Sequence, residues 1–185
     1  VLEFAGLILA GAGLIGSGEP TICNGANLSF RKSVFLELGG YSDQMHLSSG
    51  EDELLMQKIA SQTKYKVKFC WDENAVVTTH PNKDLKGFIH QRKRWASKGL
   101  FYESKKLVLL LAMIYLFYLS IPLQIIFSFF ISPFFLLTAI TFLLTKFFLE
   151  YRIISKGKDM LFDGEVLRYF LIVELFQIIY IIVIG

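Results

Sequence analysis

Residues 107 to 145 read LVLLLAMIYLFYLSIPLQIIFSFFISPFFLLTAITFLLT, a run of 39 residues without Asp, Glu, Lys, Arg or His. A membrane-spanning helix needs about 20 apolar residues, so this run has room for two spans. A single straight helix would be about 58 Å long, nearly twice the hydrocarbon thickness of a bilayer. The run must therefore turn back. Residues 128–133 offer the break, because Pro133 is tolerated at the start of a second helix.

The end of the chain continues this pattern. Residues 169–184 are apolar except for Glu174 and Gln177, and they predict a third span. We expect the Glu174 carboxylate to lie near the membrane interface without a function of its own, because a charge at the bilayer centre costs about 2.5–3.5 kcal/mol. The predicted spans of this membrane domain, 107–185, are 107–128, 132–149 and 169–185.

The charged residues indicate on which side of the membrane the rest of the chain lies. The 185 residues are 54% hydrophobic with a mean hydropathy of +0.50, above the usual apolar share of a soluble domain. Eight Lys and Arg residues lie between Lys83 and Lys106, against only two acids. By the positive-inside rule, this flank and the residues before it face the cytoplasm. Cys23 and Cys70 are isolated, and no Cys/His spacing predicts a metal site.

Residues 1–106 predict an α/β domain on the cytoplasmic side. Helical patterns cover 3–14, 33–38 and 49–61, and an amphipathic period of 3.6 residues covers 84–103. Alternating or Val- and Thr-rich stretches at 27–30, 65–71 and 74–79 predict strands. The domain therefore combines short helices with short strands.

Two short segments of this domain carry candidate site residues. Cys23-Asn24-Gly25-Ala26-Asn27 combines small residues with amides, so its backbone can approach a ligand closely and its amides can hold hydroxyls. A plain turn is the alternative. Gly50-Glu51-Asp52-Glu53 places three acids at a helix start. These acids either complement the helix dipole or present one carboxylate to a cleft as a general base for a hydroxyl group.

A third segment, Gln91-Arg92-Lys93-Arg94-Trp95, lies on the amphipathic helix. Gln91, Arg94 and Trp95 are spaced i, i+3 and i+4, so they share one helix face. An arginine fork suits diphosphate oxygens, and the flat face of a tryptophan suits a sugar ring. We expect Arg92 and Lys93 to point elsewhere and to act as membrane-surface charge. The alternative is a basic interfacial helix anchored by its tryptophan.

The order of these segments resembles that of the processive, membrane-integrated family 2 glycosyltransferases, which include the cellulose, chitin and hyaluronan synthases. Cys-Asn-Gly-Ala-Asn comes first, then Gly-Glu-Asp, then Gln-x-x-Arg-Trp with its extension Ala-Ser-Lys-Gly, and then the apolar spans. The resemblance covers nearly the whole chain. It implies a GT-A, Rossmann-like fold, of which residues 1–106 are the second, acceptor half. The donor-binding half, with its Asp-x-Asp metal motif, is expected before residue 1, so the chain is expected to be a C-terminal fragment.

The resemblance also implies roles for individual residues. Asp52 is the general base, Glu51 shapes the site, Gln91, Arg94 and Trp95 bind the acceptor sugar and the donor diphosphate, and Cys23, Asn24 and Gly25 line the acceptor end. The implied partners are a nucleotide-sugar donor, a saccharide or lipid acceptor and membrane lipids, with no nucleic acid. A divalent metal, Mg or Mn, is expected with ligands outside this chain, and the isolated chain is expected to be inactive.

The implied reaction is an inverting sugar transfer at the cytoplasmic face of the bacterial inner membrane, in cell-envelope or exopolysaccharide synthesis. A second class of function fits the same residues. A non-catalytic, membrane-anchored scaffold or accessory subunit whose basic helix binds lipid needs only the amphipathic period and the spans. A transporter fits less well, because spans without internal charge mark no ion path.

Overall fold

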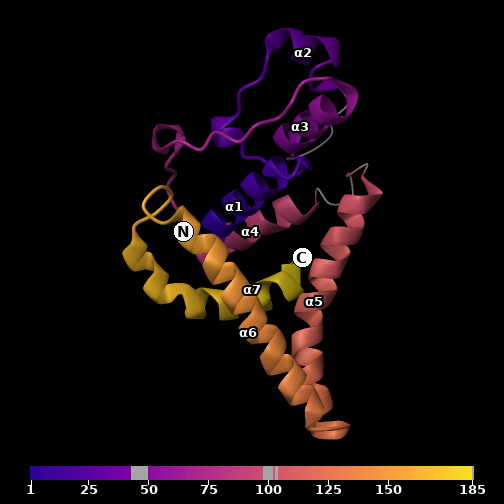
Figure 1. The fold of residues 1–185 in the computed structure, drawn as a ribbon, viewed down its shortest axis with the longest axis vertical. Coiled ribbons are helices and arrows are strands. Elements are labelled where there is room, and N and C mark those ends of the chain that lie inside the picture. Colours follow the sequence, from indigo (N-terminus) through magenta and orange to yellow (C-terminus); the bar gives the residue numbers. More distant parts are fainter. Residues whose placement is uncertain (43–49, 98–101, 103, 185) are drawn as a thin grey trace. The chain divides into compact units, whose positions relative to one another are not determined.

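The computed structural model describes residues 1–42, 50–97, 102 and 104–184. The helices are, in chain order, α1 (Leu2–Gly16), η1 (Gly25–Asn27), α2 (Lys32–Glu37), α3 (Glu51–Gln62), η3 (Glu73–Ala75), α4 (Leu85–Ala96), α5 (Lys105–Phe130), α6 (Phe134–Ile154), η5 (Ser155–Gly157), η6 (Gly164–Tyr169) and α7 (Phe170–Ile184) (Figure 1). The chain divides into two compact units. Leu7–Tyr102 is here called the motif unit, and Val1–Gly6 with Glu103–Gly185 is called the membrane unit.

The expectation of an α/β domain is wrong: the structure is 72% helical, and its described residues contain no β-strand. In the predicted strand 65–71, the side chains do alternate in burial, with Val67 and Phe69 more buried than their neighbours. A strand also needs a neighbouring strand to pair its backbone N–H and C=O groups, and the described residues provide none. Beyond this segment, the Asp72 carboxylate accepts the Asn74 N–H at 2.8 Å and turns the chain into η3, where a second strand was predicted.

Glycines and a capping aspartate mark the helix boundaries of the motif unit. Gly39 and Gly40 follow α2 with φ of 78° and 62°, values that glycine adopts without strain. Gly50, with φ of 104°, precedes α3. The Asp84 carboxylate caps α4 by accepting the Gly87 N–H at 2.6 Å. The expected starting residue of the third helix, 49, and the expected last turn of the fourth, 98–101 with 103, lie outside the described residues.

Three helices of the membrane unit are long and apolar enough to cross a membrane, namely Lys105–Phe130, Phe134–Gly157 and Gly164–Ile184. The hydroxyl of Ser104 caps α5 by accepting the Leu107 N–H at 3.3 Å, and the helix continues through Pro122. From the turn at 131–133, α5 and α6 run in opposite directions (Figure 1). The length and composition of these helices indicate a membrane protein.

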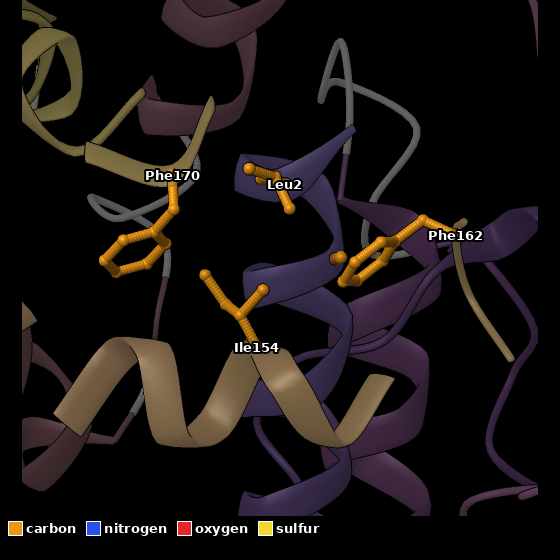
Figure 2. Close-up of a cluster of buried hydrophobic side chains, with 5 residues drawn as sticks. Leu2, Ile154, Phe162 and Phe170 are labelled. Atoms are coloured by element: carbon orange, nitrogen blue, oxygen red, sulfur yellow. The ribbon is translucent and has the colours of Figure 1, made fainter. Parts of the chain in front are cut away.

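The start of α1 packs with the membrane helices. One buried apolar cluster consists of Leu2, Ala5, Ile154, Phe162 and Phe170. Figure 2 shows side chains from α1, from the end of α6 and from the start of α7 directed toward one another. The hydroxyl of Tyr180 on α7 also donates to Glu3 Oε1 at 2.9 Å. The first residues of the chain, expected within the domain 1–106, therefore belong to the membrane unit.

Candidate active site

The acidic motif begins α3 and presents the Asp52 carboxylate with a backbone N–H on each oxygen. The Gly25 N–H donates to Oδ2 at 2.7 Å, and the Glu53 N–H donates to Oδ1 at 2.9 Å. Gly50 makes the turn into the helix at a positive φ that a residue with a Cβ rarely adopts. A carboxylate oxygen has two lone pairs, so Asp52, which is half-buried, keeps an acceptor position on each oxygen for a further donor.

The loop before α2 is held against this motif. The Asn24 side chain caps η1, and the Asn27 amide donates to a backbone carbonyl of η3 at 2.6 Å. A Cβ at position 25 would lie 3.0 Å from Asp52 Oδ2, so glycine permits the close approach of the backbone. The structure therefore brings Gly25 together with Asp52 across 27 positions of sequence.

Two tyrosines that no motif singled out lie at the acidic motif. Burial raises the pKa of Tyr41, and the Glu51 and Asp52 carboxylates raise it further. Burial also raises the pKa of Tyr102, as does the carboxylate of Glu53, to which the Tyr102 hydroxyl donates at 2.9 Å from Oε2. Both phenols therefore stay protonated at neutral pH. No spacing in the sequence predicts either of them, because the tertiary fold brings them to the motif.

The three consecutive acids have different environments. Glu51, to which the resemblance assigns a shaping role, is exposed, whereas Asp52 is half-buried. Glu53 is 6% exposed and is the buried acid beside Asp52. Cys23 is half-buried, and it lies close enough to raise the pKa values of Tyr41 and Tyr102.

The motif on α4 is arranged around an arginine that was expected at the membrane surface. Arg92 is instead buried, at 8% exposed, with its guanidinium carbon 4.3 Å from the ring centre of the half-buried Trp95. Stacking on an aromatic face lets a guanidinium lie within the protein. Gln91 Oε1 accepts from Asn82 Nδ2 at 3.0 Å, and Arg94 is exposed.

The described residues bring part of the predicted site together. Gly25 meets Asp52, whereas Gln91 and Arg94 form no hydrogen bond or ion pair with Asp52 in the described part of the chain. Lys93 is exposed, as a surface charge requires. The acidic motif and its loop are thus one assembled half of the candidate site, and α4 carries the other residues.

Comparison with known families identifies the chain. A family model described as "Glycosyl transferase family group 2" matches residues 10–182. The chain belongs to this glycosyltransferase family. No curated protein and no solved structure matched it. The matched residues include the loop, the acidic motif, α4 and nearly all of the three apolar helices, so these parts belong to one family unit.

The divalent metal expected for the glycosyltransferase was assigned to ligands outside this chain. Among residues 1–42, 50–97, 102 and 104–184, no group of three His, Cys, Asp or Glu side chains could hold a metal ion. Glu51, Asp52 and Glu53 are consecutive, but their side chains do not form such a group. The described residues therefore supply no metal centre of their own.

A second polar cluster lies among the membrane helices of the glycosyltransferase. Lys146 on α6 is 4% exposed and forms ion pairs with Glu150, at 2.9 Å from Nζ to Oε2, and with Glu174 on α7. Its Nζ also donates to Gln177 Oε1 at 3.2 Å. The hydroxyl of Tyr118 on α5 donates to Glu150 Oε1 at 3.2 Å. The cluster therefore connects all three apolar helices.

This cluster corrects the expectation for Glu174 as an isolated interfacial acid. Its carboxylate is buried, at 2% exposed, and paired with Lys146. The premise that the spans hold no internal charge is also wrong. The sequence did contain a signal: Lys146 and Glu150 are spaced i, i+4 directly after the charge-free run, which is the spacing of an ion pair on one helix face. Ionisable residues in membrane helices are usually paired in this way.

Proposed function

We propose that this glycosyltransferase moves a sugar from a nucleotide-sugar donor to an acceptor hydroxyl at the cytoplasmic face of a membrane, with inversion. The proposal depends on one observation above all, the half-buried Asp52 carboxylate oriented by the Gly25 and Glu53 N–H groups. A sugar hydroxyl is a poor nucleophile at neutral pH. A positioned carboxylate that accepts its proton accelerates the reaction by about 10²–10⁴-fold.

In the proposed step, the acceptor oxygen forms a bond to the anomeric carbon of the donor sugar while Asp52 takes the hydroxyl proton. The bond from that carbon to the nucleoside diphosphate breaks, and the diphosphate leaves with the electron pair. Attack on the face opposite the leaving group inverts the anomeric carbon. The two backbone N–H groups hold the carboxylate in one orientation, so its remaining lone pairs have a fixed direction.

The other motif residues bind substrates in this proposal. The acceptor end is lined by Cys23, Asn24 and Gly25, the acceptor sugar and donor diphosphate are bound by Gln91, Arg94 and Trp95, and Glu51 shapes the site. The exposed Arg94 guanidinium suits diphosphate oxygens because its fork can donate two parallel hydrogen bonds. Arg92, stacked on Trp95, supports the orientation of the ring that would contact a sugar.

The charge distribution supports the proposed location. The eight basic residues between Lys83 and Lys106 favour a cytoplasmic motif unit by the positive-inside rule. We place the protein in the bacterial inner membrane, acting on a saccharide or lipid acceptor in cell-envelope or exopolysaccharide synthesis. Exposed Lys93 lies on the same basic flank and suits contact with anionic lipid.

The substitution Asp52→Asn in the full-length protein tests the proposal. Membranes supplied with UDP-glucose, UDP-N-acetylglucosamine or GDP-mannose are assayed for release of the nucleoside diphosphate. We expect at least about 100-fold lower turnover with donor binding retained, because an amide keeps the shape of the carboxylate but does not take the proton. Glu37→Gln, on an exposed acid of α2, is the matched control. Near-normal turnover of Asp52→Asn would refute the role. Lipid binding without transfer by the unaltered protein would favour a non-catalytic scaffold.

A further inference from the structure

We propose that Tyr102 is a positioning residue that holds Glu53 and, through it, the Asp52 carboxylate. The functional part of this inference rests on the proposed function, in which Asp52 is the general base. The contact itself does not rest on it. The Tyr102 hydroxyl donates to Glu53 Oε2 at 2.9 Å, across 49 positions of sequence.

Glu53 connects the tyrosine to the candidate base through two different groups. Its side-chain carboxylate accepts from Tyr102, and its backbone N–H donates to Asp52 Oδ1 at 2.9 Å. A displacement of the Glu53 side chain would therefore move the first turn of α3. That turn fixes the direction of the carboxylate, and Gly25, bonded to its other oxygen, would shift with it.

The chemistry of the donor suits this role. Glu53 is 6% exposed, and a buried carboxylate is strongly destabilising unless it is hydrogen-bonded or paired. A tyrosine hydroxyl supplies a hydrogen bond without adding a positive charge. Because burial and the carboxylate of Glu53 raise the pKa of Tyr102, the hydroxyl keeps the proton that it donates.

Tyr102 lies close in sequence to the first membrane helix. It is the last residue of the motif unit and lies three positions before Lys105, where α5 begins. Tyr102 thus lies, in sequence, between α4 and α5, and its side chain contacts the start of α3. Removal of its hydroxyl tests the position of the acidic motif while leaving the aromatic ring in place.

The experiment compares Tyr102→Phe with Tyr65→Phe in the full-length protein. Tyr65 is exposed, and its ring contact with Arg31 does not involve the hydroxyl. We expect Tyr102→Phe to lower kcat about tenfold with KM for the nucleotide-sugar within about twofold, because a displaced base slows the reaction without weakening donor binding. The control should match the unaltered protein. An unchanged kcat, or a change confined to KM, would overturn the inference.

A double substitution shows whether the tyrosine acts through Glu53. We expect Tyr102→Phe combined with Glu53→Gln to turn over no more slowly than Glu53→Gln alone, because residues that share one interaction are not additive. Independent effects that multiply would contradict the proposed path from Tyr102 through Glu53.

Hydrogen exchange separates the inference from the proposed function. Peptides covering residues 23–30 report the Gly25 amide, whose N–H is bonded to Asp52. We expect about tenfold faster exchange there in Tyr102→Phe and no change in Tyr65→Phe, whatever the enzyme transfers. Unchanged exchange would overturn the positioning role. Normal turnover of Asp52→Asn together with faster exchange in Tyr102→Phe would overturn only the general-base role.

Discussion

Two pairs of acids in this glycosyltransferase lie in different sets of hydrogen bonds and ion pairs. In the motif unit, Asp52 and Glu53 accept from backbone N–H groups and a tyrosine hydroxyl. In the membrane unit, Glu150 and Glu174 share the ammonium group of Lys146, and Glu150 also accepts from the Tyr118 hydroxyl. A neutral donor orients a carboxylate and leaves it able to accept a proton. A buried cation balances the charge and joins helices. The first arrangement suits chemistry, and the second suits assembly.

The largest expected effect comes from removal of the shared cation. Lys146→Met leaves Glu174 buried without its ion-pair partner, so we expect about 3–5 kcal/mol less stability. Unfolding of the purified full-length protein by SDS in detergent micelles measures it. Lys156→Met, on an exposed lysine of η5, should leave the unfolding curve unchanged. Equal curves for the two variants would show that the ion pair does not stabilise the membrane unit.

The next prediction separates charge balance from packing. Replacing both partners, Lys146→Met with Glu174→Leu, should restore stability to within about 1 kcal/mol of the unaltered protein, because an apolar pair often substitutes for a buried ion pair without loss. Glu150 keeps its hydrogen bond from Tyr118 in this variant. The same SDS titration measures the recovery. A double variant less stable than Lys146→Met would mean that the polar contacts themselves specify how the helices pack.

On the side of the motif unit, Gly25→Ala should affect turnover more than stability. The new Cβ would lie 3.0 Å from Asp52 Oδ2, so the loop or the carboxylate must shift by a few tenths of an ångström. We expect about tenfold slower nucleoside diphosphate release, because catalysis depends on the position of the base. Gly13→Ala in α1 meets no atom within 4 Å and should stabilise the protein by about 0.5–1 kcal/mol with unchanged turnover. Full activity of Gly25→Ala would argue against a fixed Asp52.

The smallest expected effect is that of Tyr118→Phe, the counterpart of Tyr102→Phe. Each tyrosine donates to a glutamate, but Glu150 also has an ion pair with Lys146. Loss of one hydrogen bond between membrane helices should cost about 0.6 kcal/mol and leave kcat unchanged. SDS unfolding and the transfer assay measure the two quantities. A fall in kcat matching that of Tyr102→Phe would mean that hydroxyl donors in both units support the reaction.

Several parts of the fold could be predicted from local patterns. The region of the apolar helices followed from composition, because long, predominantly apolar segments suit a bilayer. The strand predictions at 65–71 and 74–79 were wrong, since alternation specifies which side chains turn inward but not whether a second strand lies alongside. The prediction that Arg92 is a surface charge was also wrong. Its spacing from Trp95 in the sequence did not reveal that the guanidinium stacks on the indole ring.

In the candidate site, too, some residues were predicted from motifs and others were found only in the structure. Asp52 and Gly25 were predicted from their motifs, and their direct hydrogen bond is a finding of the structure. Tyr41 and Tyr102 were missed, because neither has a spacing or a neighbour that marks it. Glu53 was predicted only as one of three acids at a helix start, without a role of its own. The structure distinguishes it from Glu51 by its burial and by its hydrogen bond from Tyr102.

The order of residues alone established the family motifs, the apolar helices and the presence of an acidic helix start, because these depend on composition and on contacts within a few positions. Which carboxylate is buried, which tyrosine it meets and which lysine joins the membrane helices depend on contacts between residues 27 to 49 positions apart. Such contacts are set by how whole helices pack. No local propensity encodes the partner of Glu53 or of Glu174, and only the packed chain brings each acid to its donor.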